Sequence, residues 1–182
     1  MCLSMPMYAQ NSEKKMVKVP KQLSLESGYR YIFSTKRLGT EVTNGYGFLF
    51  DYAWKLSGLD GSRAAAYISV PLGYTILMPA NDTSSRVSML CYGWTVRHEI
   101  GHGKRFTPYF GYGLLLNQMR IGDITGSVMG HQTQFEFGVN YATPKRLKYF
   151  AKLQYSYTSF PQLNEEKRIV MNFADVRVGV RF

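Results

Sequence analysis

Apolar and polar side chains alternate with a period of two residues from Gln22 to the end of the chain. This period puts successive side chains on opposite faces of a β-strand. Within Tyr46–Leu56, every second residue is an aromatic residue or leucine. Similar runs occupy residues 22–34, 64–78, 87–100, 107–121, 133–142, 147–157 and 169–182. The pattern therefore predicts eight consecutive strands.

Residues typical of turns separate these runs, as in Thr43-Asn44-Gly45 and Asp60-Gly61. Short connections favour antiparallel neighbours. We expect longer connections to alternate with shorter ones. The longer set is Thr35–Asn44, Pro79–Arg86, Gly122–Gln132 and Thr158–Arg168, and the shorter set is Ser57–Arg63, Gly101–Phe106 and Thr143–Arg146. Long loops on one side and short turns on the other are typical of membrane β-barrels, whose short turns face the periplasm.

The composition of the face opposite the aromatic residues indicates which face of the sheet lines the interior of the barrel. This opposite face is rich in glycine, which weakens an exposed strand but makes room in a narrow bore. It also carries both charge signs, and we expect a charge network inside the bore formed by Glu26, Arg30, Asp51, Lys55, Glu136, Lys152 and Arg177. Leu49, Leu115 and Phe150 would help to fill the bore. The alternative is a soluble lipocalin-like barrel with its aromatic face inside.

No stretch approaches the ~18 consecutive apolar residues of a membrane-spanning helix. A chain that crosses lipid without helices must close its sheet, because lipid cannot satisfy the hydrogen bonds of a free edge. The predicted fold is therefore all-β: an eight-stranded antiparallel up-and-down transmembrane β-barrel. Eight strands leave a bore that side chains fill, so a large diffusion pore is disfavoured.

The net charge of +10 raises the question of a nucleic-acid partner. The basic residues are scattered along the predicted strands and turns, which disfavours nucleic acid and favours a phosphate-rich lipopolysaccharide leaflet. Of the two cysteines, Cys2 lies in a segment that we expect to be removed, which leaves Cys91 without a partner for a disulfide.

The first ten residues, MCLSMPMYAQ, resemble the end of a secretory signal peptide, with Ala9 the last residue removed. We therefore divide the chain into a residual signal-peptide segment at 1–9, an N-terminal linker at 10–21 and a barrel at 22–182. This division predicts export to the outer membrane of a Gram-negative cell.

Three segments carry a resemblance to a known family. The last strand, Ala174–Phe182, ends in an aromatic residue preceded by apolar residues at alternate positions, namely Val176, Val178 and Val180. This resembles the signal by which barrel-assembly machinery recognises its clients. The segments TPYFGYGLLLN (107–117) and YISVPLGY (67–74) resemble strands of the porin-like outer-membrane β-barrel domain, which includes OmpA-, OmpX- and OmpW-type barrels. The resemblance implies fold and location but no particular activity.

Two candidate chemistries were considered. His98-Glu99-Ile100-Gly101-His102 is an H-E-x-x-H sequence, which binds zinc only on a helix. In a strand its two histidines would stand roughly 13 Å apart, so we expect no metal site. His131 and Ser127 are the candidates for a lipid A-modifying enzyme, which needs the base within hydrogen-bond reach of the hydroxyl.

The sequence thus predicts no catalytic residue and no cofactor. The function that we expect is structural, or an interaction through surface loops. The alternatives are lipid A modification, a small-molecule conduit and an accessory barrel of a secretion system.

Overall fold

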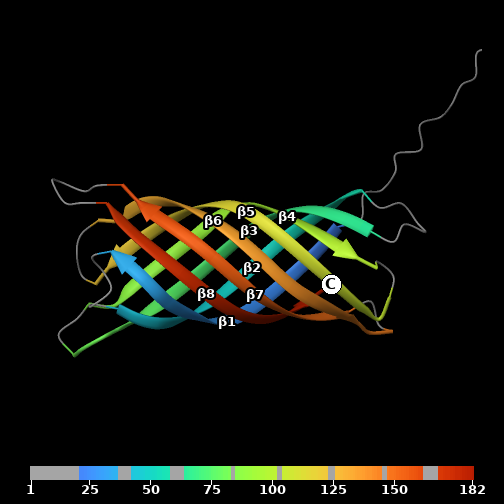
Figure 1. The fold of residues 1–182 in the computed structure, drawn as a ribbon, viewed down its shortest axis with the longest axis horizontal. Helices are drawn as coiled ribbons and strands as arrows, with labels where there is room; N and C mark the ends of the chain where they lie inside the picture. Colours follow the sequence, from blue (N-terminus) through green and yellow to red (C-terminus); the bar gives the residue numbers. More distant parts are fainter. Residues whose placement is uncertain are drawn as a thin grey trace, which may run out of the picture.

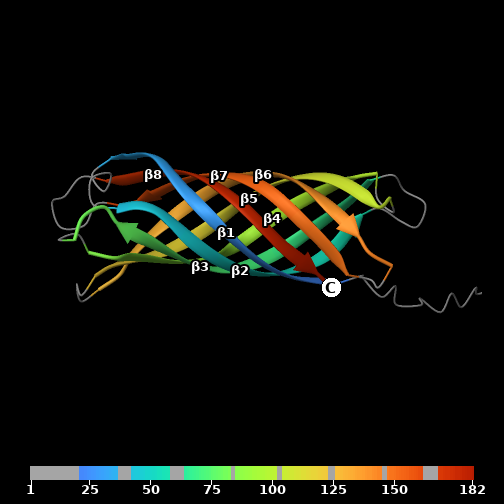
Figure 2. The same ribbon diagram turned by 90° about the horizontal axis from the view of Figure 1, so that it is seen from below.

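The chain folds into a closed barrel of eight antiparallel strands in sequence order (Figures 1 and 2). The computed structural model describes residues 21–36, 42–57, 64–82, 85–101, 104–122, 126–144, 147–161 and 168–182. The strands are β1 Lys21–Lys36, β2 Val42–Ser57, β3 Ala64–Pro79, β4 Val87–Ile100, β5 Phe106–Ile121, β6 Val128–Ala142, β7 Lys148–Phe160 and β8 Ile169–Arg181. The predicted fold class is confirmed. The proposed segment 1–9 and residues 10–20 of the proposed linker 10–21 lie outside the described residues, whereas Lys21 already belongs to β1.

The two ends of the barrel are named here by their connections. The proximal end holds Phe182 and the connections β2–β3, β4–β5 and β6–β7, and the distal end holds the other four connections. Between strands lie 5 to 8 residues at the distal end and 5 or 6 at the proximal end. The predicted contrast in length is therefore much weaker than expected. Its cause is that β1, β6 and β7 continue into segments that the sequence indicated as loops.

The Asn44-Gly45 turn predicted from the sequence is wrong, because both residues belong to β2. The pairing of β2 with β3 shifts register between Val42 and Gly45, so a strand irregularity takes the place of a turn. Gly45 is buried, and a Cβ there would collide with the carbonyl of Ile76. Close approach of two backbones explains this glycine better than a reversal of the chain does.

The aromatic face of the sheet lies outside. Phe48, Trp94 and Phe137 expose 68%, 57% and 68% of their surface, which excludes the alternative of a soluble barrel with these rings in its core. The described ranges contain no helix long and apolar enough to cross a membrane.

The interior has two parts along the barrel axis. Its distal part is an apolar cluster made of Val42, Leu77, Val87, Met89, Met119, Phe160, Met171 and Phe173. The remainder is lined mainly by buried charged and polar side chains, with a small second apolar cluster of Ala53, Ala65 and Tyr67 towards the proximal end. Glycines make room for the larger ones, as predicted: a Cβ on Gly111 would lie 2.8 Å from Oε1 of Glu136.

The barrel closes where β8 meets β1. Their ladder runs from Ser24 paired with Arg181 to Lys36 paired with Val170. Beyond it, the amide of Phe182 donates to the carbonyl of Leu23 at 2.9 Å. This seam gives every described strand a neighbour on both sides, so that the sheet has no free edge.

Candidate functional site: the charged interior

Lys152 on β7 lies inside the barrel and bridges carboxylates from two other strands. Its Nζ is 2.9 Å from Oε2 of Glu26 on β1 and 2.8 Å from Oε2 of Glu136 on β6. Arg177 on β8 approaches the other oxygen of Glu26 at 3.7 Å. All four side chains are buried. Four of the residues predicted for the network thus meet, although they are far apart in the sequence.

Arg30 joins the network through Asp175, a residue that was not among those predicted for it. The guanidinium donates from Nε to Oδ1 at 2.7 Å and from Nη2 to Oδ2 at 2.9 Å. This two-pronged geometry is the strongest form of an arginine–carboxylate pair. Asp175 also lies 3.7 Å from Arg177, and so connects the pair to Lys152 and its partners. Asp175 could have been found, because it shares the inward register of Arg177.

Asp51 and Lys55 stand apart from this network. Neither forms an ion pair with another described residue, and Oδ1 of Asp51 is buried with no hydrogen-bond partner among them. Asp51 is buried, whereas Lys55 is half-exposed towards the proximal end of β2. Position in the inward register was therefore sufficient for placing a residue in the bore, but not for predicting its partner.

A second charged group occupies the proximal part of the bore. Glu99 on β4 is fully buried, with Arg97 at 3.6 Å and Nδ2 of Asn140 donating to it at 3.0 Å. Arg181 stacks over Phe150 at 4.1 Å and over Tyr109 at 4.8 Å. Stacking of this kind suits arginine because the guanidinium is planar and weakly hydrated.

The H-E-x-x-H sequence is divided between the two faces of β4. Glu99 points inward, whereas the ring of His98 stacks on Phe110 outside, 4.9 Å between centroids. His102 lies outside the described residues. The prediction that this segment is a strand and not a helix is confirmed. Within the described part of the chain, no group of three potential metal ligands occurs.

Neutral amides and hydroxyls connect the charges to the apolar cluster. Gln132 accepts from Asn117 at 3.0 Å and donates to Gln134 at 3.0 Å. Gln154 continues the chain by donating to Gln134 at 3.1 Å and to Asp175 at 3.2 Å. Periodicity placed Asn117, Gln134 and Gln154 on the inward face, but Gln132 was assigned to a loop, and nothing in the sequence indicated the mutual hydrogen bonds.

Charges in the bore balance. Among the described residues, five buried cations (Arg30, Arg97, Lys152, Arg177, Arg181) face five buried carboxylates (Glu26, Asp51, Glu99, Glu136, Asp175). The net charge of +10 therefore comes from residues outside this buried set, such as the half-exposed Lys55 and Lys148. The pocket between Glu26, Asp51, Arg97, Glu136, Lys152 and Arg181 has a volume of about 10 Å³, hardly enough for one water molecule. Leu49, Leu115 and Phe150 are buried here, as expected.

Pairing on this scale indicates a structural role. Burial of an isolated charge costs several kcal/mol, and pairing with hydrogen bonding offsets that cost. A group that is held by two or three partners in a filled space has no room for a substrate. The interior is thus suited to holding strands together.

The pair considered for lipid A chemistry is not assembled. Ser127 accepts from Nε2 of Gln118 at 2.7 Å, and no hydrogen bond links it to His131 in the described part of the chain. The two residues are four positions apart on an extended segment, which separates them by roughly 13 Å. His131 faces Ser159 instead, across the β6–β7 pair, and the hydroxyl of Ser159 accepts from Nε of Arg168 at 2.5 Å.

The residues of the predicted assembly signal lie on the outer face of β8. Val176, Val178 and the terminal Phe182 expose 56%, 56% and 57% of their surface, and Val180 is half-buried. Their exposure leaves them accessible to lipid or to a protein.

Comparison with solved structures identifies the fold. The barrel superimposes on Neisserial surface protein A with a TM-score of 0.60, at 18% identity over 88% of this chain and 95% of that one. The chain has the fold of the small outer-membrane β-barrels. OprG from Pseudomonas aeruginosa (TM-score 0.51, 10% identity) matches 90% of this chain with 95% of its own length. The outer membrane enzyme PagL (TM-score 0.50, 14% identity) matches 86% with 97%. No family model and no curated protein sequence matches the chain.

Proposed function

We propose that this protein is an integral β-barrel of a Gram-negative outer membrane, with a structural or interaction role carried by its distal surface. The observation that supports this most directly is the inverted polarity of the barrel: exposed aromatic and aliphatic side chains outside, paired charges inside. In water, such an exterior would be a large aggregation-prone patch. In lipid it is the favourable surface.

The proximal end faces the periplasm in this proposal. That orientation is supported by the connections, of which the longest lies at the distal end, as expected for surface loops. Aromatic rings gather near the proximal rim, where Tyr52 meets Trp54 at 4.7 Å and Phe106 meets Tyr141 at 5.1 Å. Rings of this kind favour the level of lipid headgroups.

Fractionation and gel mobility test the membrane location. We expect the protein in the outer-membrane fraction, and we expect the folded form to migrate differently from the boiled form in SDS, because the closed sheet resists the detergent. The same preparation unfolded in urea before loading is the control. Recovery in the soluble fraction without a mobility shift would contradict the proposal.

A closed bore is part of the proposed function. Because the pocket between the charged groups has a volume of only about 10 Å³, we expect no steady conductance when the purified barrel is inserted into planar lipid bilayers. A sixteen-stranded porin in the same bilayers is the positive control. Stable open channels at low voltage would favour the alternative of a conduit.

Lipopolysaccharide is the proposed partner of the distal rim. Arg86, Arg120 and Arg168 are exposed there and can pair with phosphate. Nucleic acid is not a proposed partner, because the basic residues stand on separate strands. Weaker retention of lipopolysaccharide by a triple Arg→Gln variant, relative to the native barrel, would support this assignment.

Export by the signal segment 1–9 and recognition of Phe182 by barrel-assembly machinery belong to the same proposal. We expect Phe182→Ala to lower the amount of folded barrel in the membrane. The matched control is Phe106→Ala, because Phe106 is a similarly exposed aromatic residue at the proximal end. Equal yields of the two variants would contradict a signal role for Phe182.

A further inference from the structure

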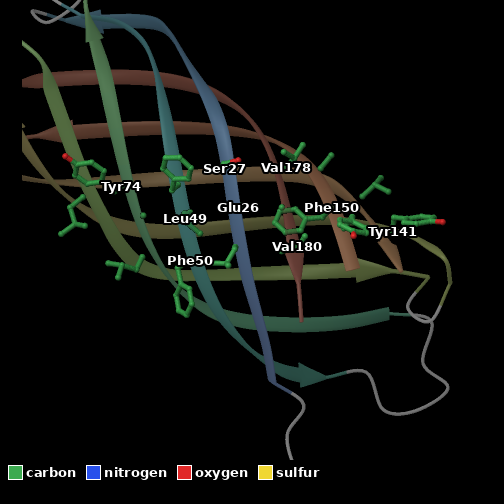
Figure 3. A pocket seen from close by; sticks show the side chains of 18 residues that line it. Glu26, Ser27, Leu49, Phe50, Tyr74, Tyr141, Phe150, Val178 and Val180 are labelled. Carbon is green, nitrogen blue, oxygen red and sulfur yellow. The ribbon is translucent and has the colours of Figure 1, made fainter. Parts of the chain in front are cut away.

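An oblique groove crosses the outer face of the barrel. Its volume is about 1040 Å³, and apolar side chains of β4, β3, β2, β1, β8, β7 and β6 line it. Figure 3 shows its course from Tyr74 on β3, past Ser27 on β1, to Tyr141 on β6. Six steps between neighbouring strands at ~4.8 Å give a length of about 29 Å.

Small side chains line one stretch of the groove. Ser27, Val178, Ala151 and Val139 stand side by side in register on β1, β8, β7 and β6. On the proximal side the parallel row is Leu25, Val180, Tyr149 and Tyr141, and on the distal side it is Tyr29, Val176, Leu153 and Phe137. The short row and the proximal row both line the groove, whereas the distal row does not. On β1, β7 and β6 a short side chain therefore stands beside a larger one, which leaves space along the outer surface.

A cation stands where this channel reaches the proximal rim. Nε of Arg105 donates to the hydroxyl of Tyr141 at 3.0 Å, and the guanidinium lies 5.0 Å from the centroid of that ring. Nη2 of Arg105 also donates to this hydroxyl, and because Arg105 is exposed, its three remaining N–H donors can reach an outside ligand. Lys104 beside it is exposed as well. Tyr141 thus joins the apolar channel to two neighbouring positive charges.

The combination fits one class of ligand. We propose that the groove binds an anionic glycerophospholipid of the periplasmic leaflet, with its phosphate on Arg105 and one acyl chain along Val139, Ala151, Val178 and Ser27. This site rests on the proposed membrane location. The short-residue stretch covers three strand spacings, about 14 Å, comparable to half of the roughly 30 Å hydrocarbon core. The other end of the groove, at Leu90, has no comparable contact with a described cation, which argues against lipopolysaccharide as the occupant.

Native mass spectrometry of the barrel in detergent, titrated with phosphatidylglycerol, tests the site. We expect one tightly bound lipid on the native chain. Ala151→Trp fills the channel and is expected to weaken binding roughly tenfold, the cost of excluding about two methylenes. Ala174→Trp is the matched control, because Ala174 is an exposed alanine on the same outer face and does not line the groove.

A second variant tests the proposed contact between Arg105 and the lipid phosphate. Arg105→Gln is expected to weaken phosphatidylglycerol about fivefold, the usual effect of one cation at a membrane surface. Arg120→Gln, at an exposed distal arginine, should leave it unchanged. Phosphatidylcholine should bind the native chain more weakly than phosphatidylglycerol does.

Three results would overturn the site: equal lipid binding by the two tryptophan variants, equal affinity for the two lipids, or lipopolysaccharide as the species retained by the groove. The gel-mobility shift separates these failures from failure of the membrane location itself. A barrel that shifts on the gel but shows any of these results refutes only the lipid site.

Discussion

The distal and central parts of the bore are filled by different chemistry, although the same inward register of the same strands lines both. In the centre, Lys152 and Arg30 hold carboxylates from other strands. In the distal part, Met119 and Phe173 are completely buried among other apolar side chains. The outer wall changes in the opposite sense, because it is apolar around the centre but carries polar residues distally, namely Ser88, Gln118, Arg120, His131 and Asn172.

Given the proposed membrane location, this exchange of polarity lets one barrel contact both lipid and water. The strands have 13 to 16 residues, whereas 9–11 tilted residues suffice to cross a bilayer. The additional distal residues have an apolar inside and several polar side chains outside, an arrangement closer to that of a soluble protein. Given the proposed location, the distal part projects beyond the lipid as a small core of ordinary type, and the charged part is surrounded by hydrocarbon.

The largest expected effect concerns the central charges. Lys152→Met would leave Glu26 and Glu136 facing each other without their shared cation, and we expect it to lower the free energy of unfolding by about 3–5 kcal/mol. Urea unfolding in detergent, followed by tryptophan fluorescence, measures this. Lys21→Met, at the exposed start of β1, is the control and should change little. Near-equal stabilities would show that the network contributes nothing to stability.

Met119→Ala probes the distal cluster in the same assay. Removal of a fully buried methionine leaves a cavity, and we expect a loss of about 3 kcal/mol. Because Met119 and Lys152 belong to separate clusters, the loss in the double variant should equal the sum of the single losses within about 0.5 kcal/mol. Strong coupling would contradict the division of the interior into two parts.

Two arginine substitutions compare the central and distal parts of the outer face. Leu114, in the middle of β5, is 69% exposed, and Leu114→Arg should cost about 2–4 kcal/mol in lipid. Met129 lies near the distal end of β6, where Met129→Arg should cost only about 0–1 kcal/mol. Unfolding in lipid vesicles compares the two, and equal costs would contradict the proposed position of the bilayer.

The smallest expected effect is at the boundary between the two parts. Gln132→Leu would remove the acceptor of Asn117 and Thr158, so we expect a loss of about 1–2 kcal/mol. Thr133→Leu, the neighbouring position on the outer face, should be nearly neutral. If Gln132→Leu left the free energy of unfolding unchanged, the hydrogen bonds of Gln132 would contribute nothing to stability, and an apolar residue could replace it without cost.

The sequence was most informative where the two faces differ in chemistry. Around β2 and β6, aromatic residues alternate with glycine or charge, and the strands, their faces and the inward position of Glu136 followed directly. Charged partners were harder to predict, because Asp175 meets Arg30 only when β8 closes on β1. Such a contact depends on ring closure, which a local pattern does not contain.

The apolar cluster was not predicted, and the reason is physical. Near the distal end the inward residues are apolar, and in places so are the outward ones, as in Ile76-Leu77-Met78. Alternation then carries no contrast from which the inward face could be chosen. The same loss of contrast explains why residues 128–132 were assigned to a loop although they begin β6.

The bridging position of Lys152 has a consequence for the order of assembly. Hairpin β7–β8 carries Lys152, Arg177 and Arg181 against one acid, Asp175. This hairpin lies between β6 and β1. Glu136 on β6 and Glu26 on β1 are not paired with cations of their own strands, and both bind Lys152 of the hairpin. Given the proposed membrane location, an unfinished sheet would keep two anions and an excess of cations apart within hydrocarbon. Electrostatics would therefore make ring closure, and not an arrested open intermediate, the favourable end of insertion.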